Sequence, residues 1–228
     1  MAAASAILLF GSRARRDNDR ASDTDLLFIC QEPHLRHVSA GAISMFYYPW
    51  QKLLTDARNG DLFVGHLVQE ARPLSDPLDQ LGELRSSFRL RANYRREIEH
   101  ASDLGWFIAR FPHHLKPSLT VKRMVWCVRT ILIAQLAEEG KLVFAPTRLA
   151  KLAGSKAATD LLIERRRRLP DDKMQRTFRR FLLMSTERQR WHGEKAEDYF
   201  IQRFSETSNE VALKALQQNT QCDSHTYA

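Results

Sequence analysis

The fold of this chain is decided near its N-terminus by residues 8–29, which read LLFGSRARRDNDRASDTDLLFI. Residues 8–10 form an apolar run that is too short for a helix and is ended by a glycine, a pattern that predicts a buried strand. Gly11 and Ser12 then allow a tight turn that opens a short helix, whose free N–H groups suit phosphate oxygens, and residues 13–21 are expected to contain this helix and the start of the loop after it. The hydroxyl of Ser12 serves either as an N-cap or as a phosphate ligand.

A second strand is predicted over residues 24–29, and two carboxylates stand at its start. Residues at i and i+2 of a strand point to the same side, so Asp23 and Asp25 are expected next to each other. Two like charges this close are costly unless a cation neutralises them. Mg²⁺ is a hard cation that proteins hold with carboxylates and substrate phosphates together. The stretch therefore combines a turn that can bind phosphates with a carboxylate pair that can bind a metal. Metal-assisted phosphoryl or nucleotidyl transfer requires both.

These residues resemble the signature of the polymerase-β-like nucleotidyltransferase superfamily, and they are most similar to its minimal nucleotidyltransferases. The shared pattern is Gly-Ser-x-Ala-Arg, a polar gap and Ser-Asp-x-Asp-Leu, and it consists here of Gly11, Ser12, Ala14, Arg15, Ser22, Asp23, Asp25 and Leu26. Arg16 stands where the family often has glycine. The motif covers a small part of the chain, but its two halves have the family's spacing, which makes it far more specific than a lone glycine-rich loop.

The resemblance implies an α/β (α+β) fold, in which a small mixed sheet is followed by an α-helical bundle. It implies Asp23 and Asp25 as the catalytic residues and the ligands of Mg²⁺, with Mn²⁺ as the alternative metal, and Gly11, Ser12 and Ser22 around the nucleotide phosphates. The implied reaction transfers a nucleoside monophosphate from an NTP, such as ATP, or a dNTP to a hydroxyl and releases pyrophosphate.

The sequence does not identify the acceptor of the nucleoside monophosphate. Members of the resembled superfamily modify protein hydroxyls in toxin–antitoxin pairs, extend nucleotides or oligonucleotides in antiviral defence and second-messenger synthesis, or modify small molecules. A homo-oligomer is also compatible with the resemblance. These acceptors and partners stay open at the level of the sequence.

One feature of the resembled family is missing from the next predicted strand, residues 42–48. The family often has a third metal-binding carboxylate there, and this chain has Ser44 or Phe46 at the corresponding positions. The candidate substitutes further along the chain are Asp56, Asp61 and Glu70. The chain is therefore an enzyme with a two-carboxylate site, an enzyme with a substituted carboxylate, or a catalytically silent nucleotide-binding antitoxin or partner protein.

The sequence predicts a nucleotidyltransferase domain over residues 1–77, a helical domain over 78–216 and a flexible tail over 217–228. In the first domain, helices are expected over 50–58 and 62–70, residues 31–39 are expected to be a loop, and a short last strand is expected at 72–74. The helical domain is expected to begin with one helix over 78–111, ended by Pro112.

The net charge of +8 is unevenly distributed. Residues 1–90 contain ten Lys and Arg against eleven Asp and Glu, a net charge of −1, so the rest of the chain has a net charge of +9. Such an excess indicates a polyanionic partner, either a nucleotide or nucleic acid or an acidic protein. Lys122, Arg123 and Arg129 are expected on one helix and are predicted to bind the triphosphate or the acceptor.

A rival motif lies in the same half. Arg95 and His100 form an Arg-x4-His pattern, which resembles that of the higher eukaryotic and prokaryotic nucleotide-binding RNases and would make the protein a nuclease. Three cysteines without a zinc spacing indicate reduced thiols and a cytoplasmic location. No apolar run approaches the ~18 residues of a membrane span, so a membrane partner is not expected.

Overall fold

The computed structural model describes residues 4–18, 22–31, 34–164, 167, 169–186 and 196–220. The chain forms two compact units. The first unit contains the described residues up to Asn93 together with 136–145, and the second contains 94–135 and the described residues from 146 onward.

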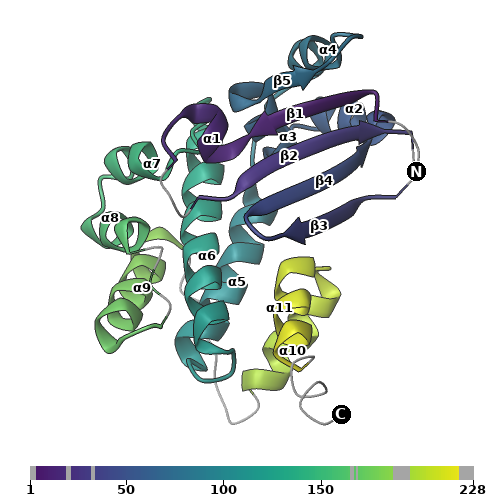
Figure 1. Cartoon of the computed structure of the whole chain (residues 1–228). Coiled ribbons are helices and arrows are strands. Elements are labelled where there is room, and N and C mark those ends of the chain that lie inside the picture. The colour runs from purple at the N-terminus through teal and green to yellow at the C-terminus, as the bar shows by residue number, and fades with distance from the viewer. Residues whose placement is uncertain are drawn as a thin grey trace. The chain divides into compact units, whose positions relative to one another are not determined.

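The first unit is built on a five-stranded sheet with the order β3-β4-β2-β1-β5 (Figure 1). Its strands are β1 (Ala6–Phe10), β2 (Thr24–Cys30), β3 (Arg36–Ala40), β4 (Ile43–Pro49) and β5 (Arg72–Ser75). β2 and β4 pair in parallel, whereas the other neighbours are antiparallel, so the sheet is mixed. The short segment between β1 and β2 is α1 (Gly11–Arg15).

Two helices, α2 (Trp50–Arg58) and α3 (Leu62–Glu70), lie behind the sheet in Figure 1. The buried core beneath them uses alternate strand residues, such as Leu8 and Phe10 on β1 and Leu27 and Ile29 on β2. This alternation is expected when only one face of a strand meets the core. Both helices have the bounds predicted from the sequence.

The first unit extends beyond residue 77, where the sequence predicts the domain boundary. Helix α4 (Gln80–Ser87) packs against α2 and α3, and Leu81 and Leu84 join the core under the sheet. The chain then leaves the helical conformation, because Phe88 is extended and the Arg89 N–H donates to the Ala57 carbonyl at 3.0 Å. The predicted single helix over 78–111 is therefore two helices.

The second unit is helical. Its helices are α5 (Arg95–Arg110), most of α6 (Pro117–Glu138), α7 (Pro146–Leu152), α8 (Lys156–Ile163), α9 (Asp172–Ser185), α10 (Ala196–Glu206) and α11 (Glu210–Thr220). Large apolar side chains such as Phe107, Phe178 and Phe200 are fully buried between them. Residues 217–220 of the predicted tail belong to α11, and 221–228 lie outside the described residues.

A sheet-based unit and a helical unit together make an α+β protein, as the sequence predicts. The strand β3 was expected to be a loop, and its exposed polar residues explain why it carries no apolar signal. Among the residues that the structure describes, none of the helices has the length and apolar character needed to cross a bilayer.

Candidate active site

The turn after β1 has the conformation that its glycine allows. Gly11 has φ +73°, a left-handed value that residues with a side chain rarely adopt, and it opens α1 directly. α1 ends after one turn, because Arg16 is itself left-handed and its N–H donates to the Arg13 carbonyl. The short helix predicted after the turn is confirmed as α1, and residues 19–21 of the loop predicted after it lie outside the described residues.

Strand pairing brings Asp25 to this turn. In the antiparallel register of β1 and β2, Asp25 is the partner of Phe10, the residue immediately before Gly11. A Cβ atom on Gly11 would overlap the Oδ2 atom of Asp25. The carboxylate therefore occupies the space that a side chain at Gly11 would need, and the predicted phosphate turn and one predicted metal ligand are in contact.

The remaining motif residues lie in the segment that leads into β2. Asp23 is exposed and stands one residue before the strand, whereas Ser22 is buried. The carbonyl of Ser22 accepts a hydrogen bond from Nη2 of Arg13 at 2.9 Å, which ties this segment to α1. Ser12 is half-buried.

Ser44 stands beside Asp25 in the sheet. The parallel register of β2 and β4 pairs Asp25 with Ser44 and Leu27 with Phe46. Phe46 packs edge-on against Phe10 in the core. Of the two positions at which a third carboxylate was expected, Ser44 is therefore the one that lies beside Asp25. Within the described part of the chain, no group of three His, Cys, Asp or Glu side chains is arranged to hold a metal ion.

The three candidate substitutes for this carboxylate each have a structural partner. Asp56 pairs with Lys52 at 2.5 Å on α2, and Asp61 caps α3 by accepting from the N–H groups of Phe63 and Val64. Glu70 pairs with Arg15 at 2.5 Å. These contacts give each carboxylate a role in the fold.

Sequence reasoning missed the surroundings of Arg15, the last residue of Gly-Ser-x-Ala-Arg. Its Nη1 lies 2.5 Å from Oε2 of Glu70, which is also 2.6 Å from Nε2 of His66, and its Nε lies 3.0 Å from Oδ2 of Asp17. We call these four residues the Arg15 cluster. Burial by itself lowers the pKa of Arg15, but the carboxylates of Asp17 and Glu70 outweigh it and hold the pKa above its usual value.

The Arg15 cluster fastens the phosphate turn to the rest of the unit. The His66 ring lies edge-on against Phe10 and stacks on Phe144. Since His66 and Glu70 are on α3 and Arg15 is on α1, the cluster fixes α1 to α3 by charge as well as by packing. The sequence held one signal for it, the spacing of four between His66 and Glu70, which places them on one helical face.

The basic residues predicted to hold phosphate, Lys122, Arg123 and Arg129, lie on the part of α6 in the second unit. Lys122 is exposed. Arg123 donates from Nη2 to Oε1 of Gln218 at 3.1 Å, and burial lowers its pKa. Arg129 is half-buried. Their role in phosphate binding stays a prediction.

The two residues of the rival RNase motif face different partners. Arg95 is exposed and its Nε pairs with Oε1 of Glu99 at 2.7 Å. Nε2 of His100 lies 3.1 Å from the carbonyl oxygen of Thr207, and burial lowers the pKa of this imidazole. Neither of these contacts joins Arg95 to His100, and the RNase function stays a hypothesis.

The donor set around the turn suits Mg²⁺. Asp23, Asp25 and Ser44 offer two carboxylates and a hydroxyl, all hard oxygen ligands. Mg²⁺ commonly takes only one or two carboxylates from a protein and completes its shell with water and substrate phosphate oxygens. The residues present thus fit a magnesium ion that arrives with a nucleotide.

The fold and this site define an α+β protein whose glycine turn and carboxylate strand meet at one end of two inner strands of a mixed sheet. No protein-family model matches the chain, and no curated protein matches it. Among solved structures, a nucleotidyltransferase-like protein from Exiguobacterium sibiricum aligns with 96% of this chain and 76% of its own, at 13% sequence identity and a TM-score of 0.33.

Proposed function

We propose that the protein is a metal-dependent nucleotidyltransferase, which transfers a nucleoside monophosphate from an NTP or dNTP to a hydroxyl and releases pyrophosphate. The contact between Gly11 and the Asp25 carboxylate carries this proposal. It joins a turn able to receive phosphate oxygens to a carboxylate able to hold the metal of a nucleotide, and a triphosphate substrate needs both at once.

The residues of the turn have separate roles in the proposal. Asp23 and Asp25 hold the Mg²⁺, which when bound lowers the pKa of the attacking hydroxyl and neutralises charge on the leaving oxygen. Gly11 lets phosphate approach the backbone closely, and Ser12 donates a hydrogen bond to it. The Arg15 cluster holds α1 in position.

The acceptor that we propose is the hydroxyl of a nucleotide or oligonucleotide, because the cationic excess lies after residue 90 and suits a polyanion. A protein hydroxyl is the alternative acceptor. Lys122, Arg123 and Arg129 would contribute to phosphate binding in either case.

A second candidate function is supported by one specific observation, the pairing of Ser44 rather than a carboxylate with Asp25. With fewer negative ligands the protein would bind a nucleotide and its metal without catalysing transfer. It would then act as a silent nucleotide-dependent partner or antitoxin.

The test measures pyrophosphate release from each labelled NTP and dNTP by the full chain with Mg²⁺ or Mn²⁺, with RNA and DNA oligonucleotides as acceptors. Asp25→Asn is expected to lower the rate by a factor of about 1,000, the order of effect expected when a group that stabilises transition-state charge is removed. Asp56→Asn is the matched control, because it makes the same change in a carboxylate that pairs with Lys52, and it should keep at least about half of the rate.

The outcomes separate the candidates. Metal-dependent nucleotide binding without pyrophosphate release would support the silent partner, and Ser44→Asp should then increase release if only the third carboxylate is missing. RNA cleavage that is lost in His100→Ala and kept in Asp25→Asn would instead support the nuclease.

A further inference from the structure

Most of the net positive charge of the chain lies in a short stretch. Residues 146–186 contain eleven Lys and Arg against four Asp and Glu, a net charge of +7, whereas the whole chain has +8. This stretch includes three consecutive helices of the second unit, α7, α8 and α9. α7 packs against α8 and α8 against α9, so the three form one layer (Figure 1).

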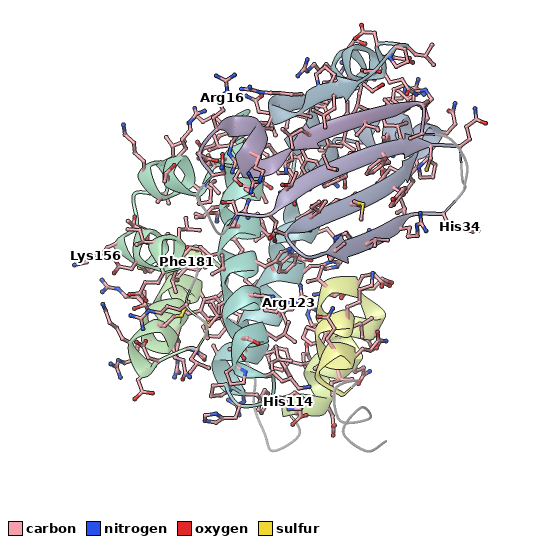
Figure 2. All side chains as sticks on the ribbon, viewed as in Figure 1. Arg16, His34, His114, Arg123, Lys156 and Phe181 are labelled. Atoms are coloured by element: carbon pink, nitrogen blue, oxygen red, sulfur yellow. The ribbon has the colours of Figure 1, made fainter. Side chains whose placement is uncertain are left out.

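Helix α9 separates its apolar and basic residues sharply. Met174, Phe178, Phe181 and Leu182 are buried, and α9 packs with this side against α5 and α8. At 100° per residue the exposed residues lie on the opposite side, and they include Lys173, Arg176, Arg179 and Arg180. We call these four residues the α9 basic face. Figure 2 shows Phe181 inside the helical layer and Lys156 of α8 pointing away from it.

Most of the described cations of this layer form no ion pair with a described carboxylate. Within the described ranges, ion pairs in this stretch involve only Arg167 and Lys173, whose partners are Glu164 and Asp171. No ion pair among the described residues involves Arg148, Lys151, Lys156, Arg176, Arg179 or Arg180. Some exposed helical cations elsewhere do pair with carboxylates four residues away, as Lys52 does with Asp56 and Arg95 with Glu99. Charges left without partners are available to bind an anion.

We propose that the α9 basic face, with the exposed cations of α7 and α8, is a nucleic-acid binding surface. Eight of the eleven cations in the stretch are arginines, whose planar guanidinium groups bind phosphate with two parallel hydrogen bonds. The two aromatic residues of the stretch, Phe178 and Phe181, are fully buried, so no aromatic platform is exposed on which a base could stack. The surface therefore contacts the phosphate backbone and does not bind by stacking on bases.

A membrane surface fits this face less well. A helix that lies on a bilayer inserts its apolar side, but the large apolar side chains of α9 are already buried in the protein. Leu183 and Met184 are exposed at the end of the same helix, so vesicles form a necessary arm of the test.

The test measures binding of a fluorescently labelled single-stranded RNA and a DNA duplex to the full chain by anisotropy. No nucleotide is added and EDTA is present. The wild-type protein is expected to bind both, with affinity that falls steeply as salt rises. Arg176→Glu/Arg180→Glu should weaken binding at least about tenfold and make the salt dependence less steep, because two phosphate contacts are lost.

The matched control is Lys141→Glu/Lys214→Glu, which changes the net charge equally at exposed lysines that pair with Glu139 and Glu210. It should weaken binding less than about threefold, because only the long-range field changes. Circular dichroism verifies that all variants are folded. Arg176→Gln/Arg180→Gln should lose less nucleic-acid affinity than Arg176→Glu/Arg180→Glu and more than the control.

The proposal would be overturned if the control and Arg176→Glu/Arg180→Glu lost nucleic-acid affinity equally. It would also be overturned if the wild-type protein did not bind nucleic acid. Binding to vesicles that contain phosphatidylserine, without binding to nucleic acid, would assign the face to a membrane. Asp25→Asn should leave nucleic-acid binding unchanged. Failure of the proposed transferase activity and failure of this surface are therefore separate results.

Discussion

Arg15 of the first unit and the arginines of the α9 basic face in the second unit have opposite surroundings. Arg15 has only 15% of its side chain exposed and lies between the carboxylates of Glu70 and Asp17. Arg176, Arg179 and Arg180 are exposed and form no ion pair among the described residues. A cation enclosed with carboxylates is part of the fold, whereas exposed unpaired cations add little to stability and remain available for a partner.

The largest expected effect is at the enclosed arginine. Arg15→Leu should lower the free energy of unfolding by about 3 kcal/mol, because Glu70 loses a cation in a largely buried place. Arg180→Leu should change the free energy of unfolding by less than about 0.5 kcal/mol, because it removes only an exposed side chain. Urea unfolding of both variants beside the wild-type protein measures the difference.

A double variant sharpens this result. Arg15→Leu/Glu70→Leu should lose less stability than the sum of the two single variants, because the second change removes the carboxylate that the first one leaves uncompensated. Similar losses of unfolding free energy in Arg15→Leu and Arg180→Leu would show that Arg15 is no more important for stability than an exposed arginine.

The next largest effect is at the phosphate turn. Gly11→Ala should cost about 2 kcal/mol, because alanine is strained at positive φ and its Cβ would displace the Asp25 carboxylate. Gly140→Ala should cost about 1 kcal/mol, because Gly140 has a similar φ of +78° but a Cβ there would meet no described atom within 4 Å. Thermal unfolding of the two variants measures the extra loss of stability that is due to the contact with Asp25. Equal losses of stability in Gly11→Ala and Gly140→Ala would contradict this contact, on which the proposed function rests.

The smallest effect is the pH dependence of stability due to His100. Burial lowers its pKa, aided by Arg96, while the Thr207 carbonyl opposes this shift. Asp103 and Glu97 oppose it too. Because the unfolded chain then binds the proton more tightly, this contribution to stability is complete above the ordinary pKa of 6.5 and is lost as the pH falls through the lower folded value.

His100→Gln should therefore flatten the loss of stability below about pH 6.5, relative to the wild-type protein. Urea unfolding at a series of pH values measures the slope. An unchanged slope in the variant would show that another group causes it.

The local patterns of the sequence predicted much of the first unit. α2 and α3 have the predicted bounds, because Asn59 and Gly60 stop the first helix and the next one follows at once. β3 was missed because an exposed edge strand with polar residues lacks the apolar alternation by which strands are recognised. The break between α4 and α5 was missed because the hydrogen bond from Arg89 to Ala57 joins residues that are distant in the sequence.

The candidate site, like the fold, was predicted only in part from the sequence. The spacing of Gly11, Ser12, Asp23 and Asp25 predicted a turn next to a carboxylate strand, and the register of β1 and β2 brings Gly11 and Asp25 together. The pairing of Glu70 with Arg15 could not be predicted, and neither could the choice of Ser44 rather than Phe46 as the residue beside Asp25. Each depends on how separate strands and helices pack.

By itself the sequence determined the strand–turn–helix–strand order at the N-terminus and the positive charge of the later helices, because both depend on residues that are neighbours along the chain. Only the tertiary structure decided which charges are neutralised. Arg15 meets Glu70 across 55 residues, whereas the α9 basic face meets no described carboxylate except where Lys173 approaches Glu164. Ion pairs between distant residues form only once packing fixes their distance, and a linear sequence does not contain that distance.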